Sequence, residues 1–141
     1  MSPGETVIVR VPNWIGDVVM CSAGLECLAR AMSDANIVVI AKPWVKDVLV
    51  HNPHIAELII HKTRSFPMRV KDFLNTATEL RSKRASTGVL FHKNFESALM
   101  LKFAGVKRRW GRPTDSRGFL LTDKIEFNEE IVKGHQVFHY I

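Results

Sequence analysis

Residues 6–17 read TVIVRVPNWIGD, and this stretch decides the fold. Its first part, residues 6–12, is a short β-branched run ended by Pro-Asn, which is typical of a buried strand. Apolar residues then recur at helical spacing over residues 17–32, which predicts a helix. The stretch therefore joins a predicted strand directly to a predicted helix.

The same alternation continues along the rest of the chain. Further strands are predicted at residues 36–41, 57–61, 87–92 and 106–111, helices at 43–50, 70–84 and 95–104, and an exposed basic loop at 62–71. Gly105 stands where the end of a helix is expected. Strands that alternate with helices in this way predict an α/β fold, a Rossmann-like parallel sheet with helices on both faces.

Length and composition are those of one globular domain. The chain has 141 residues, of which 46% are apolar and 24% charged. No apolar stretch approaches the roughly 20 residues that span a bilayer, and we expect a cytoplasmic protein. Cys21 and Cys27 lie on different faces of one predicted helix, so we expect reduced thiols. The net charge of +6 favours anionic partners, among them phosphates, acidic sugars, nucleic acid and anionic membranes.

The end of the chain, residues 135–141 (HQVFHYI), has the pattern of an amphipathic helix that has only begun. A domain seldom ends inside an apolar periodic segment, because the apolar face would stay uncovered. We therefore expect residues 1–141 to be one domain of a longer protein. A short terminal helix that docks on the sheet is the alternative.

Asp17 is the strongest candidate for chemistry. It follows the carboxyl end of the first predicted strand, the edge where parallel α/β sheets bind ligands. Gly16 allows a substrate to approach the backbone closely. Asp17 is expected at or beside the helix N-cap, where capping alone would explain a carboxylate. Capping does not, however, require Trp14 or the Pro-Asn-Trp-Ile-Gly sequence that precedes Asp17.

Residues 12–20, PNWIGDVVM, resemble the first-strand motif of the lipopolysaccharide heptosyltransferases, glycosyltransferase family nine. Further segments resemble this family in the same order: residues 41–44 (AKPW), 52–53 (NP), 95–99 (FESAL), 104–111 (AGVKRRWG), Arg117 with 120–121 (LL), and 135–137 (HQV) with Tyr140. One departure is His92-Lys93-Asn94, where the family often has Pro-Asn-Ser before the phenylalanine. The resemblance covers nearly the whole chain.

The resemblance implies the N-terminal half of a GT-B glycosyltransferase, in which two Rossmann-like domains face each other across a cleft. The N-terminal domain of this family holds the acceptor, and the C-terminal domain holds the nucleotide-sugar. The implied reaction transfers heptose from ADP-heptose to the lipopolysaccharide inner core with inversion, and Asp17 matches the family's proposed base. No cofactor or metal is implied, and this domain alone is expected to be inactive.

Basic residues form the second candidate feature. Lys62, Arg64, Arg69 and Lys71 lie in or beside the loop at 62–71, and Lys107, Arg108, Arg109, Arg112 and Arg117 form another group. The implied acceptor carries carboxylated Kdo sugars and phosphates, which suit the planar guanidinium group. A solvated face or attraction to an anionic membrane, as peripheral contact with the inner membrane, is the alternative. The predicted acceptor-binding residues are Asn13, Trp14, Gly16, Arg64, Arg69, Lys71, Asn94, Ser97, Arg109 and Arg117.

Two other functions compete with this interpretation. A related glycosyltransferase could act on a different acidic glycan, and a stand-alone basic α/β module could bind anionic ligands such as nucleic acid. A nucleic-acid module would need aromatic residues among its basic loops, and only Phe66 and Trp110 qualify. We therefore expect no nucleic-acid partner. The six histidines lack metal-ligand spacing, and no metal site is expected.

Overall fold

The chain folds into a single layered α/β structure, seen here in a computed structural model. Residues 4–62, 64–92, 94–112 and 118–124 are described, so Arg117 and the predicted helix at 135–141 lie outside them. The elements are β1 (Thr6–Arg10), α1 (Ile15–Ala31), β2 (Asn36–Ala41), η1 (Pro43–Val45), α2 (Lys46–Leu49), β3 (Glu57–Ile60), α3 (Met68–Ser82), β4 (Thr87–Leu90), α4 (Phe95–Phe103), β5 (Arg108–Gly111), η2 (Gly118–Leu120) and β6 (Asp123–Lys124).

The sheet is parallel throughout and has the strand order β3-β2-β1-β4-β5-β6. This is the Rossmann order, and the predicted fold class is confirmed. The order reverses between β1 and β4, because β1 leads outward to β2 and β3 while β4 begins on its other side. In open α/β sheets the crevice beyond the carboxyl ends of the strands at such a reversal is where ligands bind.

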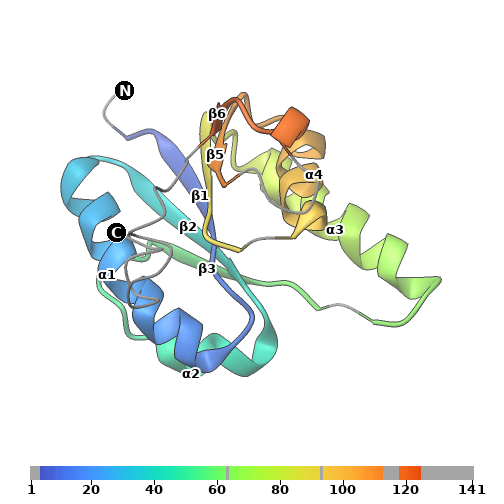
Figure 1. Ribbon diagram of the computed structural model, residues 1–141, viewed down its shortest axis with the longest axis horizontal. Helices are drawn as coiled ribbons and strands as arrows, with labels where there is room; N and C mark the ends of the chain where they lie inside the picture. Colours follow the sequence, from blue (N-terminus) through green and yellow to red (C-terminus); the bar gives the residue numbers. More distant parts are fainter. Residues whose placement is uncertain (1–3, 63, 93, 113–117, 125–141) are drawn as a thin grey trace.

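Two helical layers cover the sheet, with α1 and α2 on one face and α3 and α4 on the other (Figure 1). Side chains of β1 alternate between the two cores: Val7 and Val9 join the α1 side, and Ile8 joins the α3/α4 side. Burying each such aliphatic side chain stabilises the fold by about 1.5–3 kcal/mol. The β-branched run of the first strand is therefore buried on both faces, as the sequence predicts.

Two helices begin earlier than predicted. The chain enters α1 at Ile15 because Trp14 is extended (φ −106°, ψ 140°) and occupies the N-cap, where its own side chain makes no capping hydrogen bond. Asp17, expected at or beside the N-cap, lies in the first turn of α1, three residues after Trp14. Helix α3 begins at Met68, inside the predicted loop, because Pro67 at its N-cap lies where the missing N–H costs nothing.

Other local expectations are met. Gly105 directly follows the C-cap of α4 and has a positive φ of 76°, as a helix-ending glycine does. Cys21 is a buried free thiol and Cys27 an exposed one. Burial, followed by the nearby carboxylate of Asp17, raises the pKa of the Cys21 thiol far above its usual range. Within the described residues, no helix has both the length and the hydropathy to cross a bilayer.

Candidate functional site

Three strands are followed at their carboxyl ends by buried basic side chains on the α3/α4 side of the sheet. Arg10, Lys42 and His61 each come two residues after an isoleucine of the α3/α4 core, so strand alternation carries them to the same face. Their exposed fractions are only 3%, 6% and 2%. Buried cationic groups are costly unless they have partners or bind an anion, which marks this edge as a candidate site.

These side chains line one pocket at the carboxyl edge. The pocket has a volume of about 220 Å³. Its lining residues are contributed by the ends of β1 to β3 and by α3, α4 and η1: Arg10, Asn13, Lys42, Trp44, His61, Arg69, Asn94, Glu96, Ser97 and Met100. The α/β rule for ligand binding at this edge and the observed pocket therefore agree.

Glu96 in the first turn of α4 connects two of the basic residues. Its Oε2 accepts hydrogen bonds from Arg69 Nη2 (2.6 Å) and Nε (3.1 Å), and its Oε1 lies 3.4 Å from His61 Nε2. The Nδ1 of His61 is in turn 2.8 Å from Thr76 Oγ1. The hydrogen bond with His61, and then that with Arg69, hold the pKa of the Glu96 carboxyl at about 2.

This depressed pKa predicts a loss of stability in acid. Because the folded pKa lies below that of the unfolded chain, the contribution is complete above about pH 4.5 and is lost as pH falls toward 2. The depressed pKa of Glu96 therefore adds at most about 3 kcal/mol to the free energy of unfolding at neutral pH. Urea unfolding at pH 6 and pH 3 checks it: the Glu96→Gln variant should lose less stability on acidification than the parent chain, and equal losses would contradict the prediction.

The remaining polar groups make the pocket cationic. Arg10 Nη2 donates to Asn13 Oδ1 at 2.6 Å and its Nη1 donates to the Val11 carbonyl at 2.5 Å. Burial lowers the pKa of Arg10 to about 10, with Glu96 opposing the shift, and burial followed by the charge of Arg10 lowers the pKa of Lys42 to about 8. Among the described residues that line the pocket, Glu96 is the one carboxylate. An anionic ligand group would relieve this excess of positive charge.

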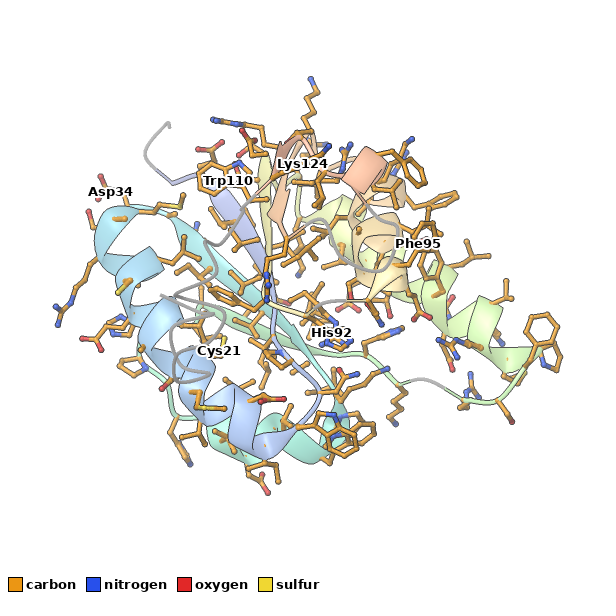
Figure 2. The ribbon with its side chains drawn as sticks, viewed as in Figure 1. Cys21, Asp34, His92, Phe95, Trp110 and Lys124 are labelled. Atoms are coloured by element: carbon orange, nitrogen blue, oxygen red, sulfur yellow. The ribbon has the colours of Figure 1, made fainter. Side chains whose placement is uncertain are left out.

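The two strands at the point where the order reverses are joined by side chains. Asn13, after β1, has its Nδ2 3.3 Å from the Nε2 of His92, which follows β4. The indole N–H of Trp44 donates to the Asn13 carbonyl oxygen, so η1 is tied to the same loop. Figure 2 shows His92 at the middle of this edge, between Cys21 on α1 and Phe95 on α4. Asn13, which lines the pocket, is thus bonded to residues that follow β4 and β2, on both sides of β1.

The sequence and the fold of this chain resemble those of known proteins. No family model matches the sequence. Lipopolysaccharide heptosyltransferase 2 of Escherichia coli K12 is 28% identical over 117 residues, which are 83% of this chain and 34% of the relative. The solved structure of E. coli ADP-heptose lipopolysaccharide heptosyltransferase II matches with a TM-score of 0.75 and 26% identity, over 89% of this chain and 36% of that one. This chain is similar to the lipopolysaccharide heptosyltransferases.

The resemblance predicted from residues 12–20 is therefore confirmed. The chain spans about a third of the length of these heptosyltransferases. A glycosyltransferase family nine structure from Veillonella parvula shares the fold over 99% of this chain and 41% of its own, with a TM-score of 0.82 and 19% identity. The parallel sheet and its helices thus correspond to part of the heptosyltransferase fold.

Four of the predicted acceptor-binding residues line the pocket: Asn13, Arg69, Asn94 and Ser97. Asn94 is the N-cap of α4, and its Oδ1 accepts hydrogen bonds from the Ser97 backbone N–H (3.0 Å) and hydroxyl (2.5 Å). This cap fixes the first turn of α4, which carries Glu96. The two residues therefore have a structural role in addition to the predicted one.

Five of the other predicted residues lie outside the pocket, namely Trp14, Gly16, Arg64, Lys71 and Arg109, and Arg117 is not among the described residues. Trp14 is exposed at the start of α1. A Cβ added to Gly16 would meet no atom within 4 Å, so the first turn of α1 has free space beside it. Arg64 forms a bidentate pair with Asp72 at 2.6–3.2 Å. Lys71 is exposed on α3. Arg109 donates to the backbone carbonyls of residues 106 and 120 at 2.6 and 2.5 Å, which ties β5 to η2.

Six pocket residues are not among the predicted site residues: Arg10, Lys42, Trp44, His61, Glu96 and Met100. Arg10 and His61 belong to predicted strands, at 6–12 and 57–61. The signal that could have found them is the period-2 alternation carried past the strand end, since it sets both side chains on one face of one edge. Lys42 and Glu96 lie within the segments that carry the heptosyltransferase resemblance, but no role could be assigned to them before the pocket was seen.

Proposed function

We propose that this chain is the acceptor-side N-terminal domain of a heptosyltransferase that transfers heptose from ADP-heptose to the lipopolysaccharide inner core with inversion. The observation that carries the proposal is a cationic pocket at the carboxyl edge, inside a fold shared with lipopolysaccharide heptosyltransferases. Arg10, Lys42 and Arg69 would contact a carboxylate or phosphate of the acceptor. Because the chain spans a third of its relatives, donor binding falls to residues beyond it, and this chain alone is expected to be inactive.

In the proposed reaction an acceptor hydroxyl oxygen bonds to the anomeric carbon of heptose while the bond from that carbon to the diphosphate breaks. The hydroxyl proton passes to a carboxylate, and Asp17 in the first turn of α1 is the proposed base. The leaving group is ADP, and no cofactor or metal takes part. The remaining predicted acceptor contacts are Trp14, Gly16, Arg64, Lys71 and Arg109, which lie outside the pocket, and Arg117, which lies outside the described residues.

The proposed location is cytoplasmic, with peripheral contact at the inner face of the cytoplasmic membrane, where a lipid-linked acceptor would be presented. The cationic pocket also suits a different acidic glycan. The sequence His92-Lys93-Asn94 differs from the pattern common in the family, and its Asn94 lines the pocket. This is the observation that favours the second candidate. Transfer to such a glycan, with no transfer to the lipopolysaccharide inner core, would support this second candidate over the first.

Substitution of Arg69 tests the pocket in the complete protein. Arg69→Ala should raise the KM for the acceptor by about 10- to 100-fold, because one charge-assisted contact is lost, and should leave the KM for ADP-heptose unchanged. Arg30→Ala is the control: this arginine is also an exposed member of an ion pair, with Glu26 on α1, and it lies outside the pocket and outside the predicted acceptor contacts. Equal effects of the two variants, or a change in donor KM, would refute the assignment.

A further inference from the structure

The N-terminal end of α3 carries apolar side chains that the protein does not cover. Phe66 is 78% exposed, and Met68, Val70 and Leu74 are between 39% and 49% exposed. We call this set the apolar tip; it consists of Phe66, Met68, Val70 and Leu74. Exposed apolar residues are ordinary when scattered, but here four fall within nine consecutive residues, and two of them, Phe66 and Val70, line one groove, which indicates a binding surface.

The tip continues into an apolar groove between α3 and α4. The groove has a volume of about 410 Å³ and is lined by Phe66, Val70, Phe73, Phe95 and Leu99, together with Arg69 and Glu96. The last two residues also line the cationic pocket. The apolar surface and the cationic pocket are therefore neighbours that share one wall.

Basic residues surround the apolar tip. Between Lys62 and Thr78 the sequence holds four cations and a single acid, Asp72. That acid is held by Arg64, at a shortest distance of 2.6 Å. Lys62 and Lys71 are exposed in the same segment. With Glu96, which pairs with Arg69 beside the groove, four cations still face two acids. This positive balance favours an anionic surface as the partner.

The position of the tip suits contact with a flat surface. In Figure 1 the segment leading into α3 and the first turns of this helix extend away from the sheet, at the far right of the view. Exposed aromatic and aliphatic side chains flanked by Lys and Arg, at one projecting end, are the features of an interfacial membrane anchor.

We propose that the apolar tip docks on an anionic phospholipid bilayer, with Phe66 inserted at the headgroup boundary and Arg64, Lys71 and Lys62 contacting anionic headgroups. This deepens the membrane contact named in the proposed function and rests on it. Docking in this orientation would set the mouth of the cationic pocket near the membrane surface, because the groove and the pocket share Arg69 and Glu96. A lipid-linked anionic acceptor would then reach the pocket without leaving the bilayer.

Vesicle sedimentation tests the proposal. The chain should bind vesicles of phosphatidylcholine containing phosphatidylglycerol, bind neutral phosphatidylcholine vesicles far more weakly, and dissociate from the anionic ones as NaCl rises. Phe66→Ser should weaken anionic-vesicle binding by about tenfold or more, since one phenylalanine no longer enters the boundary. The control is Val19→Ser on α1, a residue 54% exposed on the other helical layer, which should bind like the parent chain.

Three results would overturn the proposal: equal binding to neutral and anionic vesicles, unchanged binding by Phe66→Ser, and self-association of the chain that Phe66→Ser abolishes. Circular dichroism confirms that each variant is folded. Binding of inorganic phosphate to the pocket, measured on the same samples, separates this proposal from the proposed function. Phe66→Ser should keep phosphate binding while it loses vesicle binding, whereas a parent chain that binds vesicles but no phosphate would count against the pocket assignment alone.

Discussion

Asp17→Asn is expected to lower heptose transfer by the complete protein by about 10²- to 10⁴-fold, the usual contribution of a general base. The asparagine side chain keeps the size and hydrogen-bonding shape of aspartate but cannot accept the hydroxyl proton. The acceptor KM should change little, because Asp17 does not line the cationic pocket. The measurement is kcat and KM for each substrate in a transfer assay with ADP-heptose.

The position of Asp17 separates a chemical role from a structural one. Trp14, and not Asp17, occupies the N-cap of α1. The melting temperature of Asp17→Asn should stay near that of the parent protein, because asparagine has the same size and its Oδ1 still accepts hydrogen bonds. Asp34→Asn, at the opposite end of α1 (Figure 2), is the control for a lost surface charge. Turnover by Asp17→Asn at the parent rate would remove Asp17 from the mechanism.

The sequence predicts the fold well because its core strands are continuous apolar runs. The second strand matches its predicted bounds, Asn36–Ala41, since polar or proline-containing segments flank it on both sides. Helix ends are predicted less well: α3 starts at Met68 because a proline precedes it, and the same proline had suggested a loop. A proline both stops helices and starts them, and only the three-dimensional context decides between these outcomes.

The site could be predicted only in part, for a different reason. Asn13 and Arg69 were found because they belong to a distinctive motif and a basic segment. His61 and Arg10 were missed because their role depends on strand order: the parallel pairing of β1, β2 and β3 brings their carboxyl ends to one edge. Glu96 illustrates the same limit, since its partners His61 and Arg69 are 35 and 27 residues away in the chain.

Gly88→Val is expected to destabilise the sheet strongly. Gly88 lies in β4, and a Cβ added to it would stand 2.4 Å from Leu101 Cδ1 of α4, closer than real side chains approach. Leu101 is fully buried in the α3/α4 core and cannot swing into solvent. Overpacking of this kind costs about 1–3 kcal/mol, and the branched valine, placed between a rigid strand and a helix, should reach or exceed the upper end. Urea unfolding measures the loss.

A double-mutant cycle identifies the clash as the cause. Leu101→Ala alone should cost about 2–5 kcal/mol through the cavity that it leaves. In the Gly88→Val background the same change removes the atoms that collide with the new side chain, so the double variant should be more stable than the sum of the two losses implies. Gly16→Ala, at a position open around its Cβ, is the control that should cause no such loss. Strictly additive losses would mean that β4 and α4 adjust independently, and that the close approach of Gly88 to Leu101 does not hold this helix against the sheet.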